Sequence, residues 1–264
     1  MSDSLSSSSS SSVPRRFGGI ARLYGESAFL RFRQAHVCVV GVGGVGSWAV
    51  EALARSGIGE LTLIDLDNIA ESNVNRQLHA LTSLFGKPKA EALKERVAEI
   101  NPHCRVNCVE DFVDTSNINT FFRQPVDFVI DAIDQVQVKA AMAAYFIANK
   151  QAFITSGSAG GQKDITQIRS ADLSRVTHDP LLANMRYALR KHHNFSRDTT
   201  QKMHVPCVYS TENITPPNTT ACNTHEAPQG LSCAGYGAVM IITAAFGLHC
   251  AQHCLDYLCL QTAR

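Results

Sequence analysis

Short apolar runs alternate with amphipathic stretches between residues 37 and 156. The short β-rich runs predict strands over 37–41, 61–65, 105–109, 128–132 and 152–156, of which 37–41 is expected to be buried. Between them, the spacing of the apolar positions predicts helices over 45–55, 89–100 and 137–149. Strands that alternate with helices are typical of βαβ units, in which neighbouring strands run parallel. The pattern therefore predicts a Rossmann-like, doubly wound α/β fold with a mainly parallel sheet.

The regular alternation ends at the glycine-rich segment 157–162. Beyond it, residues 165–169 predict a strand outside the parallel series, so we expect additional antiparallel strands in the sheet. The rest of the chain predicts a basic helix over 181–193, a polar loop over 211–229 and a final apolar helix over 236–257. The second half is therefore expected to be less regular than the first.

The length and composition fit one large domain. The chain has 264 residues, 45% of them hydrophobic and 18% charged, which is ordinary for a globular protein with a sizeable core. We interpret 15–264 as a single domain, with a nucleotide-binding half over 35–156 and a half over 157–264 for substrate binding and dimer contacts. Residues 1–14 are serine-rich and carry no apolar core, so we expect them to be disordered and not a targeting signal.

Charge and cysteine content indicate the compartment in which this protein works and the kinds of partner it can attract. Lysine and arginine total 24 against 23 acidic residues, so the chain has no overall field that would attract nucleic acid. The nine cysteines are an odd number scattered among aliphatic residues, which favours a reducing compartment such as the cytoplasm. The apolar stretch 234–251 is shorter than the ~20 residues that span a bilayer, so membrane association is not expected.

A glycine-rich turn follows the first predicted strand and opens the first predicted helix. Within the GVGGVG sequence at 41–46, the first glycine permits a tight turn, the next ones let backbone approach a phosphate, and the last allows close packing of helix on strand. Free N–H groups at the start of the helix favour an anion. Asp65 ends the next strand, where a carboxylate can accept hydrogen bonds from ribose hydroxyls. This combination predicts a mononucleotide or dinucleotide site.

Three charged residues further along the chain favour a triphosphate over a dinucleotide. Arg76 and Lys89 would place two cations near the nucleotide, and Asp134 follows a parallel strand at its carboxyl end, where ligands collect in open α/β sheets. Two cations and a carboxylate that can hold magnesium suit ATP, whereas a nicotinamide cofactor needs neither. Taken alone, Arg76 and Lys89 could equally be solvated surface charges. A nicotinamide-dependent oxidoreductase and a non-catalytic nucleotide-fold scaffold stay open as alternatives.

Several longer motifs resemble those of a known enzyme family. The chain resembles the ubiquitin-activating-like adenylating enzymes in four segments, GVGGVGSWAVEALARSGIGELTLIDLD at 41–67, NVNRQ at 73–77, KPK at 87–89 and DAIDQ at 131–135. Within that family it resembles the tRNA threonylcarbamoyladenosine dehydratases in RFGGIARLYG at 16–25, INPHCRV at 100–106, GSAGGQKDITQI at 157–168 and HDPLLANMR at 178–186. The resemblance extends from residue 16 to the C-terminus and is far more specific than the glycine turn.

The resemblance implies an ATP-dependent dehydration of threonylcarbamoyladenosine at position 37 of tRNA, a cyclisation that proceeds through an acyl-adenylate. It assigns catalysis to Arg76, Lys89 and Asp134, with Asp134 also holding Mg²⁺. Binding of ATP is assigned to Gly41, Gly43, Gly44, Gly46, Asp65, Asp67, Asn73, Arg76, Gln77 and Lys89. In relatives an arginine near the N-terminus reaches into the neighbouring subunit, so the resemblance also implies a homodimer in which Arg16 or Arg22 contacts phosphate in trans; of the two we favour Arg22.

A basic stretch in the second half offers a surface for tRNA. Arg186, Arg190 and Lys191 lie on the helix predicted over 181–193 and would contact phosphates. The alternative is a solvated helix face whose charges are balanced by neighbouring acids. The residues alone do not separate these two interpretations.

Activation of the C-terminal tail of a sulfur-carrier or ubiquitin-like protein is the main alternative function. Such activators usually carry paired CxxC zinc ligands, and the absence of any CxxC from this sequence counts against the alternative. Cys233 could carry a persulfide or a thioester and so engage a sulfur-transfer protein as partner. A buried, unreactive thiol is the competing interpretation, because neutral core cysteines outnumber reactive ones.

Overall fold

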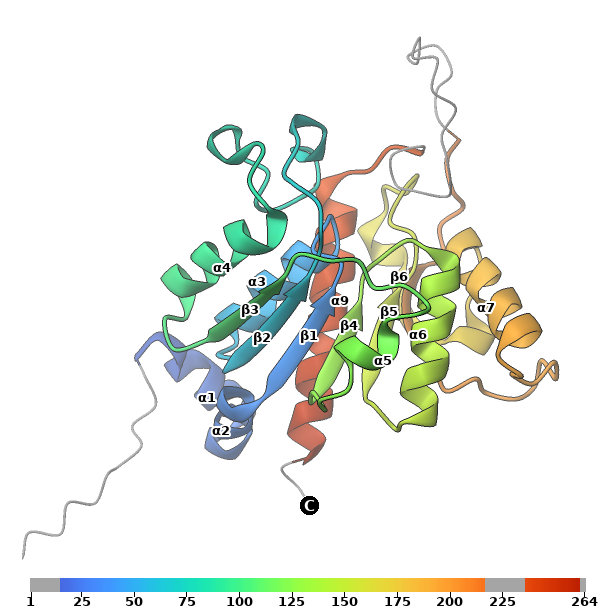
Figure 1. Ribbon diagram of the computed structural model, residues 1–264, viewed down its shortest axis with the longest axis horizontal. Helices are drawn as coiled ribbons and strands as arrows, with labels where there is room; N and C mark the ends of the chain where they lie inside the picture. Colours follow the sequence, from blue (N-terminus) through green and yellow to red (C-terminus); the bar gives the residue numbers. More distant parts are fainter. Residues whose placement is uncertain (1–14, 217–235, 262–264) are drawn as a thin grey trace, which may run out of the picture.

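The computed structural model describes residues 15–216 and 236–261, in which one sheet carries helices on both faces (Figure 1). Three predictions fall outside these ranges and stay untested: disorder over 1–14, most of the loop over 211–229, and the role of Cys233. The strands are β1 His36–Val40, β2 Glu60–Ile64, β3 Arg105–Val109, β4 Phe128–Asp131, β5 Phe153–Ser156, β6 Ile168–Asp172 and β7 Pro206–Ser210. Their order in the sheet is β3-β2-β1-β4-β5-β7-β6.

The sheet is parallel except at one edge. β1 pairs with β2 and β4, β2 pairs with β3, β4 pairs with β5, and β5 pairs with β7, all in parallel. Within the described ranges, β6 alone runs antiparallel and pairs with β7. The predicted Rossmann-like fold with a mainly parallel sheet is therefore confirmed, and the antiparallel addition is one strand in place of several.

The antiparallel strand begins three residues later than the sequence predicted. Residues Ile165–Gln167 form a turn of 3₁₀ helix because the Asp164 carboxylate caps it, accepting hydrogen bonds from the Thr166 N–H at 2.9 Å and the Thr166 hydroxyl at 2.6 Å. β6 then starts at Ile168, which pairs with Ser210 of β7. The cap therefore sets where the strand begins.

Helices cover the two faces of the sheet in separate layers. They are α1 Gly18–Tyr24, α2 Glu26–Gln34, α3 Gly46–Arg55, α4 Lys89–Ile100, α5 Ile118–Phe121, α6 Val136–Ala148, α7 Pro180–His192 and α9 Met240–Leu260. The layer of α2, α3, α4 and α9 packs on sheet residues such as Val39 and Leu63. The layer of α5, α6 and α7 packs on the opposite face, on residues such as Val40 and Ile64. Because side chains alternate along a strand, each central strand contributes to both cores.

The C-terminal helix α9 is buried along most of its length. Phe246, Cys250 and Leu258 are fully buried in the core that α9 shares with the sheet. Gly247 lets α9 approach α3 closely, since a Cβ there would overlap the carbonyl oxygen of Val45. No helix of 15–216 or 236–261 is long and apolar enough to cross a membrane.

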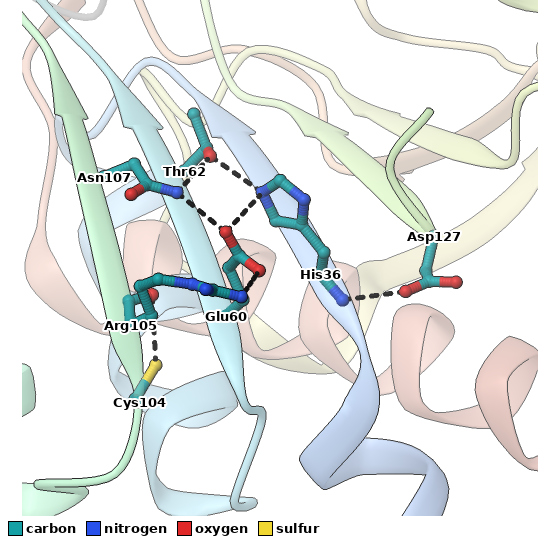
Figure 2. Close-up of polar contacts among 7 residues, drawn as sticks. All are labelled: His36, Glu60, Thr62, Cys104, Arg105, Asn107 and Asp127. Carbon is teal, nitrogen blue, oxygen red and sulfur yellow. Dashed lines mark hydrogen bonds and ion pairs between the residues drawn. The ribbon is translucent and has the colours of Figure 1, made fainter. Parts of the chain in front are cut away.

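The amino ends of β1, β2 and β3 carry a polar cluster (Figure 2). Glu60 accepts hydrogen bonds from Arg105 and Asn107 on the neighbouring strand, and His36 Nε2 lies 2.8 Å from Thr62 Oγ1. These contacts join three adjacent strands, so the polar groups satisfy one another across the sheet. The cluster lies at the opposite end of the strands from the glycine turn, and it stabilises the sheet there.

Candidate active site

A cavity of about 300 Å³ opens at the carboxyl ends of the parallel strands. Its walls come from the segments after β1, β2, β3, β4 and β5, so it spans the point between β1 and β4 where the strand order reverses. Open α/β sheets bind ligands at this topological switch point. The predicted site residues that line the cavity are Gly41, Gly43, Gly44, Asp65, Asp67, Asn73, Arg76, Gln77, Lys89 and Asp134.

The glycine turn follows the tight path that the sequence predicted. Gly41 has a φ of +81°, which favours glycine, and its N–H donates to the carbonyl oxygen of Ile64 at 2.9 Å. Gly43 and Gly44 face the cavity, so their backbone can approach an anion. Gly46 begins α3, and a Cβ there would overlap the carbonyl oxygen of Gly41. Gly46 therefore lies outside the cavity lining and allows the helix to pack on the strand.

Asp65 lies at the end of β2 with its carboxylate bonded to the glycine turn. One oxygen accepts a hydrogen bond from the Val42 N–H at 2.8 Å, and the other accepts one from the Asp67 N–H at 2.9 Å. Burial raises the pKa of the Asp65 carboxyl, while the Lys89 ammonium and the two N–H groups act in the opposite direction. Each oxygen keeps a second lone pair, so the predicted contact with ribose hydroxyls fits this geometry.

Lys89 is buried at the first turn of α4, with 5% of the residue exposed. Its Nζ lies 2.6 Å from Asp67 Oδ2, and its backbone N–H donates to the Asp67 carbonyl oxygen at 3.0 Å. The Asp67 side chain is 60% exposed, so the pair is open to solvent on the Asp67 side. A solvated surface lysine would not be buried in this way, so the surface-charge interpretation of Lys89 is wrong.

Arg76 is fixed at both its backbone and its guanidinium group. Its carbonyl oxygen accepts hydrogen bonds from the Trp48 indole N–H at 3.1 Å and the Thr243 hydroxyl at 3.2 Å. One guanidinium nitrogen, Nη1, donates to the Ser72 carbonyl oxygen at 2.7 Å and to Asn75 Oδ1 at 2.9 Å. Within 15–216 and 236–261 neither Nη2 nor Nε of Arg76 has a hydrogen-bond partner, so these nitrogens of the five-donor guanidinium can donate to an anion in the cavity.

Asn73 and Gln77, which precede and follow Arg76 in the sequence, bring amide groups to the cavity. Asn73 Oδ1 accepts a hydrogen bond from the Ala70 N–H at 3.0 Å, which leaves the side-chain NH₂ group to donate. Gln77 is 7% exposed, and its Oε1 has no hydrogen-bond partner among the described residues. Buried polar atoms are almost always paired, so Gln77 indicates a place that a polar ligand or a water completes.

Asp134 follows β4 and lines the cavity with an exposed side chain. In residues 15–216 and 236–261, no group of three His, Cys, Asp or Glu side chains could hold a metal ion by itself. Magnesium, however, is usually bound by one or two carboxylates together with substrate phosphates and water. The Asp134 carboxylate beside a cavity for phosphates fits that donor set.

Of the helices in the described ranges, five begin at the cavity. Val45 before α3, Lys89 of α4, Gln135 before α6, Leu181 of α7 and Thr243 of α9 all line it. The first turn of a helix has unpaired N–H groups and the positive end of the helix dipole. The Asp179 carboxylate caps the end of α7, where it accepts a hydrogen bond from the Leu182 N–H at 2.9 Å. Among the described residues the other four helix ends have no side-chain cap, and together with two cationic side chains they favour an anion, whereas four Asp carboxylates in the same lining favour a cation bound with it.

A comparison with known proteins gives the family, since the sequence model of the ThiF family matches residues 19–263. The chain belongs to the ThiF family. It is 50% identical to the tRNA threonylcarbamoyladenosine dehydratase of Haemophilus influenzae over 246 residues, which are 92% of this chain and 93% of that protein. The Escherichia coli tRNA threonylcarbamoyladenosine dehydratase is 47% identical over 256 residues, which are 95% of this chain and 96% of that protein.

A solved structure agrees with this placement in the ThiF family. The crystal structure of the E. coli tRNA N6-threonylcarbamoyladenosine dehydratase in complex with ATP matches with a TM-score of 0.86 at 45% identity. The match covers 94% of this chain and 96% of that one. A structure of the same protein in complex with AMP matches equally well. The resemblance that the sequence motifs indicated is therefore confirmed.

The cavity of this ThiF-family chain also contains residues that the sequence did not single out. Phe112 and Val113 follow β3, residues 156–159 include the last residue of β5 and the three after it, and Thr243 comes from α9. The first two groups had a usable signal, because ligands collect at the carboxyl ends of parallel strands. Thr243 had none, since no local pattern places the C-terminal helix beside the glycine turn.

Arg22, predicted to act in trans, lies far from the cavity of its own chain. It is exposed on α1, and α1 lies beyond the amino ends of the strands (Figure 1).

A groove of about 910 Å³ between the N-terminal turn, α3 and α4 is larger than the switch-point cavity but holds none of the predicted nucleotide residues. Its arginines are engaged, Arg16 with carbonyl oxygens at the end of α4, and Arg55 and Arg96 with Glu51. The smaller cavity, which gathers the predicted nucleotide residues, is therefore the candidate site.

The three residues predicted to contact tRNA lie on α7 but differ in availability. Arg186 Nη1 donates to the carbonyl oxygens of Leu173 and Val176, and burial lowers the pKa of its guanidinium. Among the described residues Arg190 makes one hydrogen bond, from Nε to the Ser196 carbonyl oxygen at 3.2 Å, and Lys191 is exposed with its Nζ 5.6 Å from the centre of the Tyr187 ring. Arg190 and Lys191 are therefore better placed than Arg186 to bind a phosphate.

Proposed function

We propose that this chain uses ATP to dehydrate threonylcarbamoyladenosine at position 37 of tRNA, closing a ring through an acyl-adenylate. The observation that carries the proposal is the cavity at the switch point, where four uncapped helix N-termini, Lys89 and Arg76 surround a space suited to a triphosphate. High identity to two dehydratases along nearly the whole chain supports the choice of substrate.

The first step joins the substrate to the nucleotide. The threonyl carboxylate attacks the α-phosphorus of ATP, a carboxylate oxygen forms the new bond to phosphorus, and the bond to pyrophosphate breaks. Both reactants are anionic, so their repulsion must be offset. Lys89, the free N–H groups of Arg76 and the backbone N–H groups of the glycine turn would offset it and stabilise the charge that grows on pyrophosphate.

The remaining cavity residues would orient ATP. We assign the ribose hydroxyls to Asp65, and we assign polar contacts with the phosphates to Asn73 and Gln77. Asp67 would hold the Lys89 ammonium group by their ion pair until ATP binds, and the same ammonium group would then also bind a phosphate. Asp134 would hold Mg²⁺, which when bound neutralises phosphate charge beyond what the side chains supply.

The second step closes the ring. The carbamoyl group of the same modified side chain attacks the activated carbonyl carbon, the bond to AMP breaks, and the attacking group loses a proton. Because both groups belong to one molecule, the step benefits from a high effective molarity and needs no nucleophilic side chain. Exclusion of water matters more, since hydrolysis of the acyl-adenylate would consume ATP without product.

The proposal extends to the assembly and its surroundings. We propose a cytoplasmic homodimer in which Arg22 of one subunit contacts phosphates in the other, and in which Arg190 and Lys191 bind tRNA. The exposure of Arg22 and of its neighbour Leu23, which is 76% exposed, is compatible with such a contact. A sulfur-transfer protein as further partner receives no support from the seven described cysteines, because burial raises the pKa of each thiol.

The test measures AMP formation from ATP, Mg²⁺ and tRNA that carries threonylcarbamoyladenosine. Arg76→Ala and Asp134→Ala are each expected to slow AMP formation by about 100-fold or more, because each removes a group that stabilises charge in the transition state. Arg105→Ala, which removes an exposed arginine at the far end of the sheet, is the matched control and should react at the wild-type rate. Wild-type rates in both cavity variants would contradict the proposed mechanism.

A further inference from the structure

A buried ion pair lies directly behind the loop that carries Asp134. Asp131, the last residue of β4, is 2% exposed, and Lys139, in the first turn of α6, is completely buried. Lys139 Nζ lies 3.0 Å from Asp131 Oδ1. A buried pair of charges rarely adds stability over an apolar pair of similar volume, so stability alone is a weak reason for it. The hydrogen bonds that this ion pair makes point to a more specific reason.

The pair holds both polar groups of a single residue, Ile133. The Ile133 N–H donates to Asp131 Oδ1 at 3.2 Å, and the Ile133 carbonyl oxygen accepts a hydrogen bond from Lys139 Nζ at 2.9 Å. Thr155 on the neighbouring strand β5 donates its hydroxyl to Asp131 Oδ2 at 2.7 Å. The residue immediately before Asp134 is thus fixed by charge-assisted hydrogen bonds at both its N–H and its carbonyl group.

The same residue touches the glycine turn. A Cβ on Gly41 would lie 2.9 Å from Ile133 Cγ2 and 3.1 Å from the Ala132 carbonyl group, so the loop packs against the bare face of that glycine. The Ala132 N–H donates to the Val40 carbonyl oxygen at 2.8 Å, which ties the loop to the end of β1. Ile133 therefore lies between the phosphate-binding turn on one side and Asp134 on the other.

We propose that the Asp131–Lys139 pair is a positioning device that sets the Asp134 carboxylate relative to the glycine turn. Neither side chain lines the cavity, so each would act through Ile133 and not on a ligand. The inference rests on the proposed function, in which Asp134 holds the divalent cation of a nucleotide. Residues that orient a metal ligand from behind typically change metal affinity or activity 10- to 100-fold when they are replaced.

The pair could instead serve the fold alone, and the two roles predict different results. A purely structural pair would lower the melting temperature of a variant without changing cation binding by the folded fraction. A positioning pair would change cation binding even where folding is restored. The decisive readout is therefore cation affinity in folded protein, measured apart from turnover.

The experiment measures Mn²⁺ binding by electron paramagnetic resonance in the presence of a non-hydrolysable ATP analogue, with thermal denaturation alongside. Lys139→Met leaves Asp131 charged and unpaired, so it should both lower the melting temperature and weaken Mn²⁺ binding. The double variant Asp131→Asn with Lys139→Met removes both charges and the hold on the Ile133 carbonyl group. It should fold and bind Mn²⁺ 10- to 100-fold more weakly than the wild type. Thr155→Val, which removes one hydrogen bond to Asp131, should weaken binding less, in the same direction.

The control is Glu51→Gln, which weakens a partly buried ion-pair network between α3 and α4 away from the cavity. It should lower the melting temperature and leave Mn²⁺ affinity unchanged. A folded double variant with wild-type Mn²⁺ affinity would overturn the proposal. Failure of the proposed function would give different results. Either Asp134→Ala would bind Mn²⁺ as tightly as the wild type, or the wild type would bind Mn²⁺ and the ATP analogue but form no AMP from ATP in the presence of modified tRNA.

Discussion

Replacement of Lys89 by methionine should separate nucleotide binding from stability. Methionine keeps most of the buried stem and removes the ammonium group, which lies 2.6 Å from Asp67 Oδ2. The Asp67 side chain is 60% exposed and stays hydrated without its partner, and removal of the buried ammonium group also removes its desolvation cost, so the folding cost should be small, about 0–1 kcal/mol. For a bound triphosphate the loss is larger, because truncation of one member of a desolvated charge pair costs about 2–5 kcal/mol.

These magnitudes translate into a measurable loss of ligand-induced stabilisation. A loss of about 2 kcal/mol in binding weakens affinity about 30-fold. ATP with Mg²⁺ at 100 times the wild-type dissociation constant stabilises the wild type by about 2.7 kcal/mol, whereas the same concentration stabilises the Lys89→Met variant by about 0.9 kcal/mol. In a domain of this size, 1 kcal/mol shifts the melting temperature by about 2–4 °C, so the two proteins should differ by several degrees in their response.

The assay compares melting temperatures with and without ATP and Mg²⁺, and calorimetric titration supplies the dissociation constants. Lys94→Met is the matched control on the same helix, since Lys94 is 47% exposed and pairs with Glu91 only at 3.5 Å. Its response to ATP should equal that of the wild type, and NAD should stabilise none of the three proteins. A Lys89→Met variant that folds and responds to ATP like the wild type would refute the role given to Lys89.

Two further predictions concern other parts of the molecule. Charge reversal of both Arg190 and Lys191 to glutamate should weaken tRNA binding by about 10-fold or more at low salt and leave ATP affinity intact, because these cations would contact phosphate only; equal tRNA affinity in a filter-binding assay would remove this patch from the site. His79 should make the protein sensitive to acid, since burial, with a smaller contribution from Lys89, lowers the pKa of its imidazole to about 4. The folded state thus resists protonation, and stability should fall by up to about 3 kcal/mol between pH 6.5 and pH 4. Denaturant titrations should show a shallower loss in His79→Leu, and parallel curves for the two proteins would contradict this explanation.

The central strands and helices could be predicted because local pattern and global fold agree there. The buried parallel strands read as apolar runs, and α4 was predicted with the bounds that the structure shows. The elements that were missed depend on tertiary contacts. α2 is short and acquires its place by burying Phe29 and Phe32, and β7 is a strand only because it pairs with β5 and β6.

The residues that line the cavity could be predicted more completely than the groups that hold them in place. The glycine turn and Asp65 have fixed spacings, and strand ends pointed to Asp134, because the chemistry of phosphate binding imposes a local sequence pattern. The groups that hold these residues in place carry no such pattern. Thr243 reaches the Arg76 carbonyl oxygen from the far end of the chain, and burial of Lys139 depends on the packing of α6. Such contacts become visible only when the fold is known.

The central claim is that the cavity binds ATP in order to activate the substrate's own carboxylate for ring closure. The most direct measurement is the mass of the nucleoside at position 37 after tRNA with threonylcarbamoyladenosine is incubated with the protein, ATP and Mg²⁺. The proposed reaction predicts a product lighter by one water, formed together with AMP and only when ATP is present. An unchanged nucleoside mass after complete consumption of ATP, or the same loss of water without ATP, would contradict it.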